Sequence, residues 1–184
     1  MADVTVVTEL RPSRIGQRFL AKLLDGLIVL PAVIWSAWVV VESRPMAMLF
    51  PLAGLAFYLW YDIYLVRHFG GTPGKLLAKL RIAKLDGSPV GYREALLRSS
   101  VELMFTVLAQ IALLAAILQI PDAEYRRLDL ANWVASINQA KPAWAGLTQL
   151  SSTLWTLTVL IVLLVNKRRR TLHDFIAGTI VVQR

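Results

Sequence analysis

Four apolar stretches of about twenty residues divide the sequence, and they constrain its fold more than any other feature. A helix rises about 1.5 Å per residue, so a stretch of this length crosses a bilayer core of roughly 30 Å. The stretches cover about residues 17–41, 46–66, 95–120 and 147–165. They predict an all-α membrane protein, a bundle of four transmembrane helices that forms a single domain over residues 1–184.

The basic residues are concentrated beside particular links, and this distribution predicts the orientation. Of the 20 Lys and Arg residues, sixteen lie in or next to segments 1–16, 67–94 and 166–184, which we expect to be cytoplasmic together with both termini. The other four are Arg44, Arg126, Arg127 and Lys141. The net charge of +8 is therefore explained by the orientation of the protein in the membrane, and it does not indicate nucleic-acid binding. A multi-pass protein of the bacterial plasma (inner) membrane is expected.

Residues 121–146 form a long link on the expected outer side. Leu130, Trp133, Val134 and Ile137 recur at helical spacing. This periodicity predicts an amphipathic helix that lies on the outer leaflet and carries no chemistry.

Three carboxylates fall inside the expected spans, where each costs roughly 3 kcal/mol on insertion scales unless it finds a partner, a proton or water. They are Asp25, Asp62 and Glu102, and Arg18 and Arg98 lie at similar depth. We expect all five to meet in one network in the inner half of the membrane. This cluster is either a satisfied polar core that fixes helix packing, or an ion-exchange site with Asp25 as the exchanging group, Arg18 as its tuning partner, and Asp62 and Glu102 as secondary groups.

Thr72, Pro73, Gly74 and Lys75 follow a glycine pair, but the spacing and the missing Ser or Thr after the lysine exclude a P-loop. The pattern predicts instead a short interfacial helix with Thr72 as N-cap and Pro73 at its first position. Its leucines, with Leu80, would face the membrane. Residues 80–85 and 179–183 have strand character, so a small two-stranded β pairing is expected on the cytoplasmic side.

His173 and Asp174 are adjacent, but no third member of a catalytic triad is visible. Two histidines and no cysteine give weak evidence for a metal site. We therefore expect no enzyme, no metal and no cofactor. His173 and Asp174 are expected to hydrogen-bond within the cytoplasmic cap, with Asp174 accepting from Arg18 or Arg81.

Taken jointly, several of these motifs resemble the RDD family of membrane proteins over nearly the whole chain. The matching residues are Arg18 and Asp25, Thr72, Pro73, Gly74 and Lys75, Arg81, Asp86 and Gly87, Arg93 and Arg98, and Leu172, His173, Asp174, Gly178 and Thr179. The second aspartate of the family name corresponds to Asp174 or Asp62. The resemblance implies sodium/proton antiport for some relatives and a role in membrane assemblies for others.

Two functions follow from this sequence. The first is membrane transport of a cation, sodium or the proton, through the Arg and Asp cluster of a homo-oligomer. The alternative is a non-catalytic interaction or assembly module that binds a partner membrane protein or the anionic headgroups of the lipid bilayer. The residues expected to bind lipid are Lys75, Lys79, Lys84, Arg168, Arg169 and Arg170.

Overall fold

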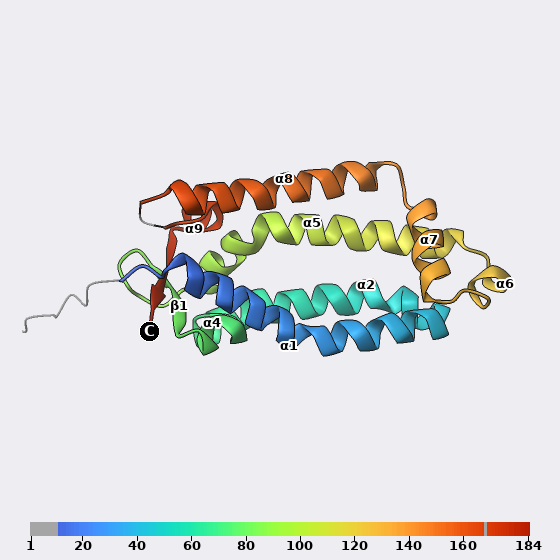
Figure 1. Cartoon of the computed structure of the whole chain (residues 1–184), viewed down its shortest axis with the longest axis horizontal. Helices are drawn as coiled ribbons and strands as arrows, with labels where there is room; N and C mark the ends of the chain where they lie inside the picture. Colours follow the sequence, from blue (N-terminus) through green and yellow to red (C-terminus); the bar gives the residue numbers. More distant parts are fainter. Residues whose placement is uncertain (1–10, 168) are drawn as a thin grey trace, which may run out of the picture.

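A computed structural model describes residues 11–167 and 169–184 as a bundle of long helices with smaller elements at both ends (Figure 1). The elements are α1 (Ile15–Glu42), α2 (Arg44–Tyr58), η1 (Leu59–Tyr64), α3 (Leu65–Phe69), α4 (Pro73–Leu77), β1 (Leu80–Lys84), α5 (Tyr92–Gln119), α6 (Asp122–Tyr125), α7 (Leu130–Ala140), α8 (Trp144–Val165), α9 (Leu172–Ala177) and β2 (Thr179–Gln183). We call the end with β1, β2, α4 and α9 the cap end, and the end with α6 and α7 the loop end.

In the part of the chain that the structure describes, four helical segments are long and apolar enough to cross a membrane, as expected. They are Ile15–Glu42, Arg44–Leu77, Tyr92–Gln119 and Trp144–Val165. The second helix runs further than the sequence indicated. It passes from α2 through the π-helix η1 into α3, which ends at Phe69. Gly70 stops it there with a φ of +79°, a conformation that glycine adopts without steric cost.

The outer surface of the bundle is apolar, as lipid requires. Trp35, Trp38 and Leu52 are 63%, 67% and 65% exposed. An apolar surface of this kind on a soluble protein would drive association, whereas in a bilayer it faces the hydrocarbon. Small residues fill the interior instead: Ala47 of α2 and Ala116 of α5 are fully buried, which allows the two helices to approach closely.

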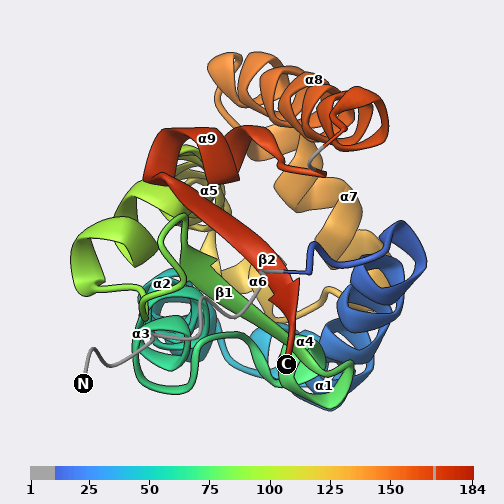
Figure 2. The same cartoon turned by 90° about the vertical axis from the view of Figure 1, so that its left-hand side faces the viewer.

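At the cap end, β1 and β2 pair antiparallel, from Leu80 opposite Gln183 to Lys84 opposite Thr179. This confirms the expected β pairing. Pro12 extends the sheet by a bridge to Val182, so the first described residues and the C-terminus lie at the same end of the bundle (Figure 2). Leu80 is completely buried in this layer. The expectation that it faces the membrane was wrong, because it belongs to β1 and not to the preceding helix.

At the loop end, α7 forms the expected amphipathic helix and closes the bundle. The indole nitrogen of Trp133 donates to the hydroxyl of Tyr125 at 2.7 Å, and that hydroxyl donates to the carbonyl of Val40 at the end of α1. Ile137 and Tyr125 are 4% and 2% exposed. These contacts tie the long link onto α1 and α5 rather than leaving it as a separate surface helix.

Helix α5 is central: it packs against α2, α7, α8 and α9. Helix α4 packs against α1, on the other side of the cap. Helix α8 contacts chiefly α5 and α9, so it lies at the periphery of the bundle, which both views show (Figures 1 and 2).

Candidate functional site

Asp174 occupies the centre of the cap end, and its side chain is fully buried. It lies in the first turn of α9, where the backbone nitrogen and the hydroxyl of Thr171 each donate to its Oδ2 at 2.9 Å. This Thr and Asp arrangement is a capping box that starts the helix. The guanidinium of Arg98 forms an ion pair with Oδ1, and that of Arg18 lies 3.4 Å from Oδ2. Asp174 therefore connects α1, α5 and α9.

The ionised form of this carboxylate is strongly favoured over the protonated form. Burial by itself would raise its pKa, but the positive charges of Arg98 and Arg18, together with the hydrogen bonds from Thr171, outweigh burial and lower the pKa to about 2. Asp174 is therefore a permanent anion at neutral pH, held between two cations. The sequence offered Arg18 or Arg81 as the donor to Asp174, and in the structure the donor is Arg18.

Asp25 forms a second polar site, between α1 and α4. Its Oδ1 accepts hydrogen bonds from the hydroxyl of Tyr61 at 2.5 Å and from the backbone nitrogen of Gly74 at 2.7 Å. Its Oδ2 accepts from the hydroxyl of Thr72 at 2.7 Å. Thr72 does precede the first residue of α4, but its hydroxyl binds Asp25 and does not cap the helix as expected. The carboxylate of Asp25 does that from the neighbouring helix.

Gly74 is required by this close approach of α4 to α1. A Cβ atom at this position would lie 2.3 Å from the carbonyl oxygen of Ala21 and 2.7 Å from the carboxyl carbon of Asp25. No side chain fits at such distances. The glycine of the predicted motif is thus explained by helix contact, not by backbone conformation or by phosphate binding.

Glu102 forms a third site, where α5 contacts α8 and α9. The indole nitrogen of Trp155 on α8 donates to its Oε1 at 2.7 Å, and Nε2 of His173 on α9 contacts the same oxygen. Within residues 11–167 and 169–184, no hydrogen-bond donor contacts Oε2. The side chain is 34% exposed, in contrast to the buried carboxylates of Asp25 and Asp174.

Glu102 borders a cavity of about 290 Å³ between α2, α5 and α8. Most of the residues that line it are polar: Tyr58, Glu102, Thr106, Thr148, Gln149 and Ser152. A second cavity of about 430 Å³ continues toward the loop end, with Ala109, Thr148 and Gln149 shared by the two. A groove therefore follows the seam of α5 and α8 from the loop end to Glu102, and its polar side chains are more frequent near Glu102 than toward the loop end.

Asp62 lies within the π-helix η1, a deformation that is frequent at functional sites. Among the described residues it makes no hydrogen bond or ion pair, although the charges of Lys75, Lys22, Asp25 and Arg98 act on it. Its side chain is half-buried.

The single network expected for the five membrane charges is instead divided into separate sites. Arg18 binds Asp174 and not Asp25, and Arg98 binds Asp174 and not Glu102. The physical reason is that Asp174 is fully buried and offers both arginines a charge-assisted contact, which gains more than a contact between neighbouring side chains on one helix. The role of His173 as a partner of Glu102 was missed, because 71 residues separate them and no local pattern links the two.

The remaining predicted residues are distributed over the cap end. The Lys75 amino group donates to the Thr72 hydroxyl at 3.1 Å, and Lys84 lies 3.4 Å from Glu94. Arg170 donates to the carbonyls of Asp174 and Thr179 at 2.8 and 3.2 Å.

The other residues expected at the cap or at the lipid headgroups differ in their exposure and contacts. Lys79 is exposed, Arg169 and Arg81 are half-buried, and Asp86 accepts hydrogen bonds from Ser88 in an exposed turn. Arg168 lies outside the described residues. Within those residues, no three His, Asp or Glu side chains come together as a metal site.

Comparison with protein families supplies the identification. The model of the RDD family matches residues 12–178. The chain belongs to the RDD family. Comparison with curated proteins and with solved structures gives no match. Family membership and the four apolar helices make this RDD protein an integral membrane protein.

In this RDD protein, the motif residues at the start of α1, before α4 and in α9 converge on the cap end, around Asp25 and Asp174. Glu102 and the groove lie outside those motifs. The motif residues are therefore gathered at the cap end, whereas the groove lies along α5 and α8.

Proposed function

We propose that this RDD protein exchanges a cation for a proton across the membrane, and that Glu102 is the carboxylate that binds them in turn. One observation carries the proposal: a carboxylate in a spanning helix borders a polar cavity and keeps one oxygen without a donor in the described part of the chain. Ionisable groups within spanning helices are costly and mark ion or proton pathways. His173, on the other side of Glu102, is suited to pass a proton toward the cap end.

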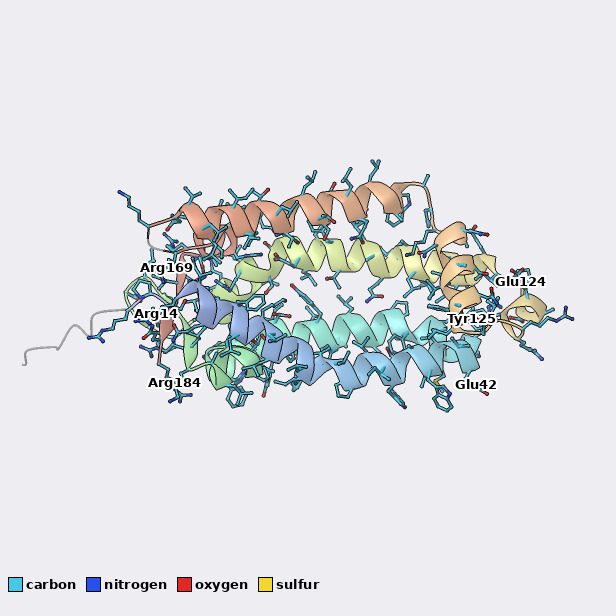
Figure 3. All side chains as sticks on the ribbon, in the orientation of Figure 1. Arg14, Glu42, Glu124, Tyr125, Arg169 and Arg184 are labelled. Carbon is cyan, nitrogen blue, oxygen red and sulfur yellow. The ribbon has the colours of Figure 1, made fainter. Side chains whose placement is uncertain are left out.

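The direction of the pathway follows from the proposed topology. Arg14, Arg169 and Arg184 lie at the cap end, whereas Glu42 and Glu124 lie at the loop end (Figure 3). By the positive-inside rule, the cap end faces the cytoplasm. A cation would then enter at the loop end, follow the seam of α5 and α8, and reach Glu102, which contacts His173 on its other side. Because four spans enclose little space, we propose that the transport unit is a homo-oligomer in the bacterial plasma membrane.

Asp25 is a poorer candidate for the exchanging group than the sequence indicated. Its two oxygens accept hydrogen bonds from Tyr61, Thr72 and Gly74, and Asp25 is 8% exposed. Fixed donors at three of the roughly four acceptor positions of a carboxylate leave little room for an ion. We assign to it the positioning of α4 against α1.

The alternative, a module that binds anionic lipid or a partner protein, depends on a free basic surface at the cap end. Lys75, Lys84 and Arg170 are instead engaged within the protein. These contacts reduce the number of charges that are free to bind headgroups, so we favour transport. The alternative retains Lys79 and Arg169, and Arg168, whose placement is not described.

The test is ion exchange by the purified protein in proteoliposomes that contain a pH-sensitive dye. We expect added sodium chloride to dissipate an imposed pH gradient, and we expect Glu102→Gln to abolish this exchange. Glu124→Gln is the matched control, since Glu124 is exposed on α6 and lines neither cavity. Both variants should elute as folded protein in size-exclusion chromatography.

The outcomes separate the parts of the proposal. If neither sodium nor any other added cation moves protons through the parent protein, transport is excluded. If Glu102→Gln retains full exchange while Asp25→Asn loses it as a folded protein, the exchanging carboxylate is Asp25 after all.

A further inference from the structure

We infer that the groove between α5 and α8 binds a small organic ammonium ion, and that such an ion, rather than a bare metal cation, is the preferred substrate. The inference rests on the proposed function, because it uses the same carboxylate, Glu102. It goes further in that it assigns the chemical class of the cargo from the size and the walls of the cavity.

The size of the cavity is the first argument. Hard metal cations are held by several oxygen ligands that close in to about 2.0–2.6 Å. The space beside Glu102 is about 290 Å³ and opens into a further space of about 430 Å³. Sites for small organic molecules have volumes of about 300–1,000 Å³. The groove therefore fits a molecule of several heavy atoms better than a dehydrated metal ion.

The aromatic wall is the second argument. The cavity that Glu102 borders is also lined by Tyr58 of α2 and by Phe105 of α5. The Tyr58 hydroxyl lies 3.3 Å from the carbonyl oxygen of Ser99, to which it donates, and this contact fixes the ring. An ammonium group is attracted to the face of such a ring by about 0.5–2 kcal/mol. A carboxylate next to aromatic rings is a suitable combination for an organic cation, since it combines charge with an apolar contact.

The hydrogen-bonding groups are the third argument. Thr106, Thr148, Gln149 and Ser152 supply hydroxyls and an amide on the two sides of the groove. These groups can bind a polar substituent of the ligand, such as a hydroxyl.

The contacts that Glu102 already makes leave room for a ligand at this site. Trp155 and His173 both contact Oε1, so they fix the direction of the carboxylate and leave Oε2 without a donor in the described residues. The ring of Trp155 also meets that of His173 edge-on, with centroids 5.5 Å apart. A proton and an ammonium ion would compete for the same carboxylate, which is the condition for coupled exchange.

The path to the site has a definite length. Six residues of α5 line the two cavities, and the first and last of them, Glu102 and Ala112, are ten residues apart, which corresponds to a rise of about 15 Å. Lys141 lies at the outer rim, where its amino group donates to the side-chain oxygen of Asn138 at 2.9 Å. Its charge is exposed and therefore screened by salt, so it does not bar a cation from the groove.

The experiment compares choline chloride with sodium chloride in the proteoliposome assay. Choline carries a permanent charge and a hydroxyl, so it does not leak through lipid as a neutral base. We expect choline to dissipate the pH gradient with saturation and at lower concentration than sodium. We expect Phe105→Leu to weaken the apparent choline affinity about 2- to 30-fold, the range that corresponds to the loss of one ring contact.

Phe19→Leu is the matched control, because Phe19 is 71% exposed on α1 and does not line the groove. It should leave the choline affinity unchanged. Exchange with sodium but none with choline would overturn the inference and leave the proposed function intact. Choline exchange that Phe105→Leu does not weaken would also overturn the assigned site. If no cation drives exchange, the proposed function fails as well. Size-exclusion profiles and circular dichroism identify any variant that does not fold.

Discussion

Replacing Asp174 by Asn removes the one anion that lies between two arginines of the cap end. Asn keeps an oxygen that can accept from Thr171, so the change isolates the charge from most of the capping geometry. Arg18 and Arg98 would lose their counterion while they remain 11% and 14% exposed. We expect a large loss of stability, because α1, α5 and α9 are held together at this point.

The structure gives the size of this loss. The lowering of the Asp174 pKa from 3.8 to about 2 corresponds to about 2 kcal/mol, at about 1.36 kcal/mol per pKa unit. Breaking a buried ion pair by removing one partner costs about 3–5 kcal/mol, since the other charge stays behind. Both arginines have some access to water. We therefore expect Asp174→Asn to lower the free energy of unfolding by about 3 kcal/mol.

The assay is reversible unfolding in mixed micelles of dodecyl maltoside and sodium dodecyl sulfate, followed by circular dichroism at several pH values. The folded-state pKa of Asp174 is lower than its unfolded value, so its stabilising contribution is complete above about pH 4 and is lost as the pH falls through about 2. The difference between the parent protein and Asp174→Asn should be constant from pH 7 to about pH 5. It should decrease toward pH 2.

Asp86→Asn is the control, because Asp86 is exposed in a turn, where its carboxylate accepts hydrogen bonds from Ser88. It should unfold like the parent. A loss below about 1 kcal/mol in Asp174→Asn at pH 7, or a difference that does not change down to pH 2, would refute the account of Asp174 as the charged centre of the cap.

Two further predictions concern the two ends of the bundle. Gly74→Ala places a methyl group 2.3 Å from the carbonyl oxygen of Ala21, so we expect a clearly lower melting temperature in detergent. Gly26→Ala, which meets no atom within 4 Å, should melt like the parent or higher; equal melting of the two variants would contradict the close contact of α4 and α1. Tyr125→Phe leaves the buried carbonyl of Val40 without its donor and should cost about 1–3 kcal/mol in the mixed-micelle assay, whereas no change would show that water replaces the hydroxyl.

Local patterns predicted much of the fold because they are set by the solvent and by the nearest neighbours along the chain. The length of the apolar stretches predicted the four spans, and the β-branched run predicted β2. Thr72 followed by Pro73 predicted the start of α4. The continuation of the second helix through η1 to Phe69 was not predicted. A π-helix has no local sequence signature, since its stability depends on what packs around it.

The chain alone determined which charged groups must find partners, because a carboxylate or guanidinium in a spanning helix is too costly to leave unsatisfied. It did not determine the pairing. For Asp174 the sequence offered Arg18 or Arg81 as the donor, and the tertiary structure decided for Arg18 and added Arg98. Only the tertiary structure placed Asp25 at the start of α4 and Glu102 beside His173 and the groove. Those contacts join residues that lie far apart in sequence, and their strength comes from burial, which exists only once the helices have packed.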